Sequence, residues 1–168
     1  IVEDKTRNFA VVGNTRRANY TGGGGLATAT ATITITDFSE LNPGDKVNLV
    51  ATDGTDYNFT QGDQSSVNGT WEATDDNDTT AANLGAVINT SNGPAGTRFT
   101  ATVDGAVITV TQSIAGSAGN TAITITDSGG EGLSKTNFTG GTSGPQRYYP
   151  RVNKKIVIQS LSIPIPVY

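Results

Sequence analysis

Residues 27–36 alternate strictly between an apolar side chain and threonine. The apolar positions are Ala27, Ala29, Ala31, Ile33 and Ile35, and every residue between them is threonine. Because successive side chains of a strand point to opposite faces of a sheet, this period of two predicts a long strand with one buried face. Threonine is branched at Cβ and favours extended backbone, which strengthens the prediction.

A first hairpin is predicted over residues 47–59, where the chain turns at Asp53-Gly54. The apolar residues of the two arms fall on one face only if the turn has three residues and contains a bulge. The expected pairs are Leu49 with Phe59 and Ala51 with Tyr57.

A second hairpin is predicted over residues 99–111, where the chain turns at Asp104-Gly105. A two-residue loop at this position brings the apolar residues of both arms onto one face. The expected pairs are Val103 with Ala106, Ala101 with Ile108 and Phe99 with Val110.

One amphipathic helix is predicted between the two hairpins. Its apolar residues follow the i, i+3, i+4 spacing of a helix and are Ala81, Leu84, Val87 and Ile88. We expect Asp78 or Thr79 to cap its start, and the sequence Ser-Asn-Gly-Pro at residues 91–94 to end it. The preceding residues 61–78 are polar apart from Trp71 and predict a long loop.

The predicted fold class is α+β and mainly β: an antiparallel sheet or sandwich of hairpins covered by one short helix, with extended N- and C-terminal arms. Residues 121–126 add a further strand, in which residues 123–127 repeat the sequence of residues 33–37. We divide the chain into an extended N-terminal arm and Gly-rich hinge (1–25), a mainly-β module (26–141), and an extended C-terminal arm with an edge strand (142–168). Four consecutive glycines form the hinge, and prolines interrupt the strand signal of the C-terminal arm.

Charge divides along the same boundaries. Residues 1–25 contain four basic and two acidic residues, and residues 141–168 contain four basic residues and no acidic one. Between these segments three basic residues face thirteen acidic ones, although the whole chain has a net charge of only −4. Opposite signs favour docking of the arms onto a module, within one subunit or between neighbours. The alternative is an acidic face that is simply solvated.

The predicted inter-subunit contacts are the basic and aromatic residues of the arms: Arg7, Arg16, Arg17, Arg147, Tyr148, Tyr149, Arg151, Lys154 and Lys155. Their charges are sparse beside those of dedicated nucleic-acid-binding arms, so we expect protein partners rather than nucleic acid. Trp71 is the candidate ligand contact, because an aromatic ring in a polar loop can stack on a sugar or a base. The alternative role for Trp71 is a core or interface anchor.

The absence of Cys and His removes disulfides, Cys/His zinc sites and Ser-His-Asp triads. We therefore expect a non-enzymatic protein with no catalytic, cofactor or metal residues. The acidic run of residues 75–78 offers oxygen ligands for Ca²⁺, but it lacks the spacing, the glycine and the closing glutamate of an EF-hand, which favours helix capping. No apolar run approaches the roughly 20 residues of a membrane-spanning helix, so we expect no membrane partner.

Residues from about 30 to 141 resemble a small module that recurs in structural proteins of tailed, especially marine, bacteriophages. The segments that carry the resemblance are Ile33-Thr34-Ile35, Thr80-Ala81-Ala82-Asn83-Leu84, Phe99-Thr100-Ala101, Val107-Ile108-Thr109-Val110-Thr111-Gln112, Ala118-Gly119-Asn120-Thr121-Ala122-Ile123-Thr124 and Phe138-Thr139-Gly140-Gly141. The resemblance implies a component of the virion and assigns no catalytic residue.

The function expected on this basis is a bacteriophage virion structural protein, in particular a capsid decoration or cement subunit that stabilises the particle through its arms. Its partners would be other virion proteins, such as the major capsid protein or a tail protein, and copies of itself. It would be located in the virion, which is assembled in the host bacterial cytoplasm. The alternatives are a tail-tube or fibre component and a carbohydrate-binding or adhesion module that uses Trp71; an enzyme and a filament-forming surface protein rank behind them.

Overall fold

The computed structural model describes residues 25–65, 68–90 and 97–144. In chain order these residues form β1 (Thr30–Ile35), the 3-10 helix η1 (Phe38–Glu40), β2 (Lys46–Val50), β3 (Asp56–Gln61), β4 (Thr70–Trp71), α1 (Asn77–Asn89), β5 (Phe99–Asp104), β6 (Val107–Gln112), the 3-10 helix η2 (Ser117–Gly119), β7 (Thr124–Thr126) and β8 (Leu133–Lys135).

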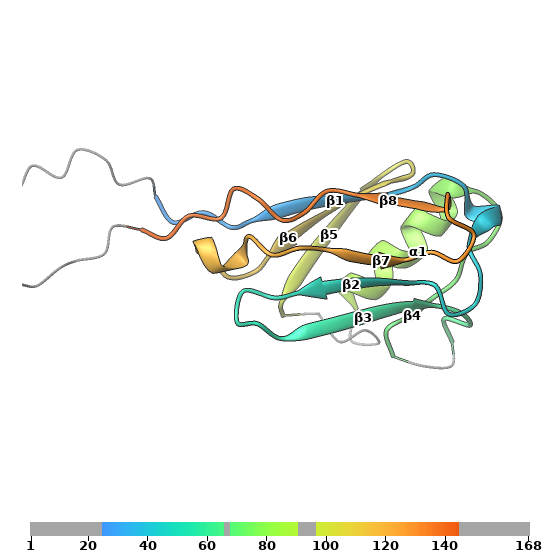
Figure 1. Ribbon diagram of the computed structural model, residues 1–168, viewed down its shortest axis with the longest axis horizontal. Helices are drawn as coiled ribbons and strands as arrows, with labels where there is room; N and C mark the ends of the chain where they lie inside the picture. The colour runs from blue at the N-terminus through green and yellow to red at the C-terminus, as the bar shows by residue number, and fades with distance from the viewer. Residues whose placement is uncertain (1–24, 66–67, 91–96, 145–168) are drawn as a thin grey trace, which may run out of the picture.

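The strands form two four-stranded sheets that face each other (Figure 1). One sheet has the order β5-β6-β1-β8 and the other the order β4-β3-β2-β7. All neighbouring strands are antiparallel except β3 and the two-residue β4, which are parallel. The module is therefore a mainly-β sandwich with one α-helix, as the sequence predicted.

The strand predicted from the threonine alternation is β1. Its isoleucines and Ala31 are buried, and its threonines face outward. The same alternation places buried Ala29 before the strand, while residues 27 and 30 form isolated bridges to residues 142 and 139. Because β1 lies between β6 and β8, its apolar face reaches the centre of the core.

The hairpin of β2 and β3 forms, but the predicted pairing is wrong by two residues. The observed pairs include Leu49 with Tyr57 and Val47 with Phe59. The loop is correspondingly longer and spans residues 51–55. Its Thr52 N–H donates to the side chain of Gln112 in the other sheet (3.0 Å), which draws the loop toward that sheet. A shift of two residues preserves the alternation of a strand, so the apolar side chains still share one face.

The hairpin of β5 and β6 shows the same kind of difference. The observed pairs include Val103 with Ile108, Ala101 with Val110 and Phe99 with Gln112. The two loop residues are Gly105 and Ala106 instead of Asp104 and Gly105. Gly105 has a φ of +55° at the first central position, which is the position that a type II′ turn assigns to glycine. The turn therefore forms one residue later than predicted, and the buried face is unchanged.

The predicted helix is α1, and it begins earlier than expected. Its N-cap is Asp76, whose carboxylate accepts a hydrogen bond from the N–H of Thr79 (2.7 Å), so neither Asp78 nor Thr79 is the cap. The buried face of α1 is formed by Thr80, Ala81, Leu84, Gly85, Val87 and Ile88. This face contacts β5, β6 and β1 of one sheet and β3 and β4 of the other, which closes one side of the sandwich. No helix in the described ranges has the length and apolar character needed to cross a membrane.

The other side of the sandwich is closed by the chain around β7 and β8. The N–H of Phe138 donates to the carbonyl of Thr121 (3.0 Å), and the N–H of Ile123 donates to the side chain of Asn137 (3.1 Å). The predicted strand at residues 121–126 is shorter than expected, and neither β4 nor β8 was predicted. Both missed strands have only two or three residues, which is too short for a recognisable period.

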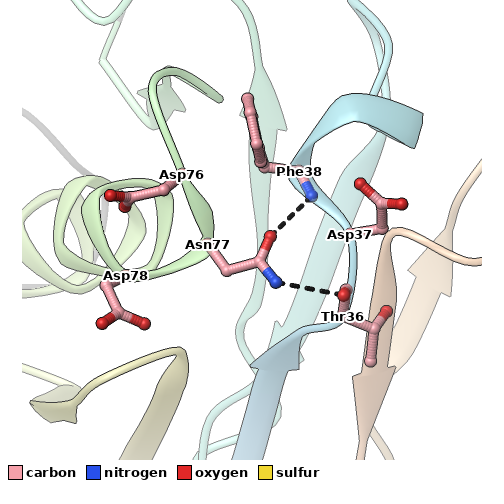
Figure 2. A pocket seen from close by; sticks show the side chains of 6 residues that line it. All are labelled: Thr36, Asp37, Phe38, Asp76, Asn77 and Asp78. Atoms are coloured by element: carbon pink, nitrogen blue, oxygen red, sulfur yellow. Dashed lines mark hydrogen bonds between the residues drawn. The ribbon is translucent and has the colours of Figure 1, made fainter.

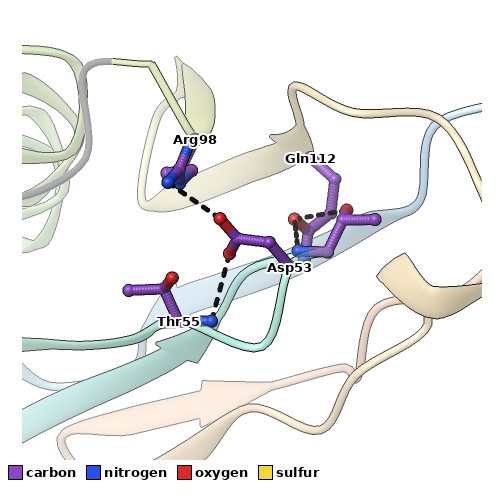
Figure 3. A network of polar contacts seen from close by, with 5 residues as sticks. Asp53, Thr55, Arg98 and Gln112 are labelled. Atoms are coloured by element: carbon purple, nitrogen blue, oxygen red, sulfur yellow. Dashed lines mark hydrogen bonds and ion pairs between the residues drawn. The ribbon is translucent and has the colours of Figure 1, made fainter.

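Side-chain amides complete the backbone pairing where a strand has no neighbour. Asn89 at the end of α1 accepts from the N–H of Ala101 (2.8 Å) and donates to its carbonyl (2.7 Å) on the outer edge of β5. Gln112 at the end of β6, labelled in Figure 3, accepts from Thr52 N–H. It also donates to the carbonyl of Val50 (2.8 Å), and the two bonds tie one sheet to the other. These carboxamides satisfy buried backbone groups that would otherwise destabilise the fold.

Candidate functional site

The two ends of the described chain leave the sandwich together. Ala27 and Thr142 exchange two backbone hydrogen bonds of 3.1 Å, and Thr30 and Thr139 exchange two of 2.9 Å. We call this pair of segments, residues 25–30 and 139–144, the terminal ribbon. It projects from one end of the module (Figure 1). Both predicted arms are therefore attached at the same end, which we call the arm end.

The base of the terminal ribbon is held by the segment around η2. Asn120 accepts from the N–H of Gly141 (2.8 Å) and donates to its carbonyl (3.0 Å). Ser117 N–H donates to the hydroxyl of Ser143 (3.1 Å). A Cβ at Gly141 would overlap the carbonyl oxygen of Gly116, so glycine is required at this contact. Two of the segments that carried the resemblance, residues 118–124 and 138–141, thus meet at the origin of the arms.

The opposite end of the module is strongly acidic. β1 begins beside the terminal ribbon and ends beside the start of α1, where Asn77 accepts from Phe38 N–H (2.8 Å) and donates to Thr36 O (3.1 Å). The turn at residues 42–45, the loop at 127–132 and the tip of the β5–β6 hairpin lie at this same end. We call it the acidic end. Its acidic residues are Asp37, Glu40, Asp45, Asp63, Glu72, Asp75, Asp76, Asp78, Asp104, Asp127 and Glu131.

Charge is therefore segregated along the module. The acidic end contains eleven of the fifteen acidic residues of the chain, and the described basic residues nearest to it are Lys46 and Lys135. At the arm end, Asp53 and Arg98 form an ion pair of 2.8 Å (Figure 3), and Asp53 also accepts from Thr55 N–H. The negative charge of the module thus gathers at the end farthest from the attachment of the basic arms.

Several carboxylates of the acidic end have structural roles. Asp45 is buried, and burial raises its pKa, but the N–H groups of Asn42 (2.8 Å) and Ser128 (2.9 Å) bind its carboxylate, and the net pKa lies below the ordinary value. The hydrogen bond from Thr79 N–H likewise lowers the pKa of Asp76. These groups are therefore ionised at neutral pH and fix the loops from which the other carboxylates project.

A shallow hollow of about 480 Å³ lies at the acidic end, between η1 and the start of α1 (Figure 2). Its lining residues are Thr36, Asp37, Phe38, Asp76, Asn77 and Asp78. Figure 2 shows the three carboxylates pointing in different directions instead of toward one point. No group of three or more His, Cys, Asp or Glu side chains in the described ranges is arranged to hold a metal ion. The observed role of the acidic run 75–78 includes the helix cap at Asp76.

Trp71 is a core residue, which corrects its assignment as a candidate ligand contact. It has no exposed surface, and its indole N–H donates to the carbonyl of Phe59 (3.1 Å). The indole face is covered, so it cannot stack on a sugar or a base. Tyr57 is half-buried and packs edge-on against Phe99, with ring centroids 5.6 Å apart. The alternative role of Trp71 as a core anchor therefore holds.

The predicted arm contacts Arg7, Arg16, Arg17, Arg147, Tyr148, Tyr149, Arg151, Lys154 and Lys155 all lie outside the described residues. The structure adds two facts: the segments that lead into both arms leave the module at one end, and the acidic side chains lie at the other end. Sequence reasoning missed Asn89, Asn120 and Gln112, the carboxamides that close the sheet edges. The sequence signals them only by their position beside the end of a predicted helix or strand.

Comparison of the chain with protein-family models, with curated proteins and with solved structures finds no match.

Proposed function

We propose that the chain is a structural protein of a bacteriophage virion, a capsid decoration subunit whose basic terminal segments bind neighbouring subunits. The observation that carries this proposal is the polarity of the module: both arms start at one end, and the acidic side chains gather at the other. The module of residues 26–141 would rest on the particle, and the arms would join it to its neighbours. We propose no catalytic activity for the chain.

The polarity favours contacts between subunits over contacts within one. From residue 27 to residue 36 the extended chain, which includes β1, spans about 30 Å at 3.3 Å per residue. An arm would have to run back along this length to reach the acidic end of its own module. In a head-to-tail arrangement, the acidic end of one subunit faces the arm end of the next directly. Complementary charge then guides the register of assembly more than it adds affinity.

The alternatives differ in how they fit the structure. A tail or fibre component would use the arms in the same way and differs only in its place on the particle. A carbohydrate-binding module loses its main support, because Trp71 is buried in the core. The module instead presents threonine-rich outer strands and polar loops, without an exposed aromatic platform in the described residues.

The proposal is tested by adding purified chain to virus particles that lack it. We expect the full chain to bind and the truncation 1–144 to bind much more weakly, with equal urea midpoints showing that both are folded. The double variant Lys154→Gln/Lys155→Gln should also weaken binding, and raised salt should remove the difference. The matched control is Lys46→Gln, which neutralises a basic residue of the module. Equal binding of all four proteins would reject arm-mediated attachment.

A further inference from the structure

The edge of β3 is one place where, among the described residues, a strand of the sandwich lacks a neighbour over part of its length. β4 pairs with β3 only at residues 60 and 61, so within the described ranges no strand lies beside residues 56–59 on that side. On the same side, the N–H of Thr60 donates to the carbonyl of Gly69 (2.9 Å). The two-residue period of the ladder therefore directs the backbone groups of Asn58 and Asp56 outward as well.

Two other edges of the fold are closed by carboxamides. Asn89 bonds both backbone groups of Ala101 on β5, and Asn120 bonds both backbone groups of Gly141 in the terminal ribbon. The edge of β3 before residue 60 has no such partner in the described part of the chain. Its exposed side chains, Asp56 and Asn58, are polar, and they interact with Asn48 on the outer face of the same sheet. An edge of this kind can accept an extended segment as an additional strand.

We propose that residues 156–158 of a neighbouring copy add to this edge as a strand. The inference rests on the proposed function, in which the arms join neighbouring subunits. The segment reads Ile-Val-Ile, which has high strand propensity, and Lys154 and Lys155 directly precede it. These two lysines complement the carboxylate of Asp56 on the edge.

The length of the arm permits this contact. Eleven residues, 145–155, separate the terminal ribbon from the segment, and an extended chain of this length reaches about 36 Å. A module of this size has a radius of gyration of about 13 Å, so the reach is sufficient for a subunit in direct contact. The added strand would form about four backbone hydrogen bonds with the edge residues.

Cysteine cross-linking tests this contact cleanly, because the natural chain contains no cysteine. The single variants Asn58→Cys and Val157→Cys are mixed, assembled on particles or concentrated in solution, oxidised, and separated by non-reducing electrophoresis. A mixed disulfide in this experiment can form only between two chains. The matched control replaces Asn58→Cys by Thr124→Cys, an exposed residue of β7 at the opposite edge of the same sheet.

We expect the Asn58–Val157 pair to give at least about tenfold more mixed dimer than the Thr124–Val157 pair, because docking raises the effective thiol concentration at one edge only. Equal yields from the two pairs would overturn the inference. A disulfide that forms only within a chain carrying both Asn58→Cys and Val157→Cys, and not in the mixture, would overturn it too, because the arm would then dock on its own module. If truncation 1–144 weakens particle binding while the cross-link fails, the proposed function stands and only the strand addition is rejected.

Discussion

Replacing Gln112 by leucine removes the polar link between the two sheets while keeping a side chain of similar size. Gln112 is 1% exposed, and its amide binds the carbonyl of Val50 at the end of β2 and the N–H of Thr52 in the β2–β3 loop. The N–H of Thr52 would lose its acceptor at 3.0 Å, whereas the carbonyl of Val50 keeps the hydroxyl of Thr121 as a donor (2.7 Å). Orphaning the N–H of half-buried Thr52 costs about 1–3 kcal/mol, and the lost bond to Val50 costs a further ~1 kcal/mol.

We therefore expect Gln112→Leu to lower the free energy of unfolding by about 2–4 kcal/mol. In urea, with a slope near 2 kcal/mol/M, the midpoint should fall by about 1–2 M at an unchanged slope. The matched control is Gln61→Leu, since Gln61 is also buried but its Oε1 has no hydrogen-bond partner among the described residues. The control should change the midpoint by less than half as much. Equal effects would refute the claim that Gln112 ties the sheets together.

Three further predictions concern the core, the acidic end and one close contact. Trp71→Ala should destabilise the module by about 3–5 kcal/mol, measured by thermal unfolding, and an unchanged melting temperature would contradict its burial. Because the folded-state pKa of Asp45 is lowered, its stabilising contribution is present above the unfolded-state pKa of about 3.9 and is lost as pH falls through the lower folded-state value. The variant Asp45→Asn should be less stable than the natural chain at pH 7 and show a smaller loss on acidification; parallel pH profiles would contradict this. A Cβ at Gly129 would overlap the carbonyl of Glu40, so Gly129→Ala should lower the urea midpoint, and a neutral effect would show that the loop can move aside.

The sequence was most informative where a pattern is local. The threonine alternation predicted β1 and its buried face, and the helical spacing of Leu84 and Ile88 predicted α1. In both hairpins the predicted face was right while the register was wrong by two residues, because alternation constrains a strand only to even shifts. In each case the observed turn contains a feature that the alternation does not encode: the bond from Thr52 N–H to Gln112 in the first hairpin, and the positive φ of Gly105 in the second.

The features that the sequence did not predict depend on long-range contacts. Trp71 lies among polar residues in the sequence, yet the parallel pairing of β4 with β3 carries its indole into the core. The bridges of Asn89 and Asn120 join segments twelve and twenty-one residues apart, and no spacing rule reports such pairs. Regional charge did predict an acidic module with basic ends, but its segregation to the end opposite the arms follows only from the topology.

The most direct test of the proposed function is electron cryo-microscopy of the virus particle, with and without the chain. We predict that the difference map contains density of the size of this sandwich on the outer surface of the capsid, with extended density leaving each module at one end and reaching a neighbour. Density on the tail would contradict the assignment to capsid decoration. A particle that contains no copy of the chain would contradict its role as a virion protein.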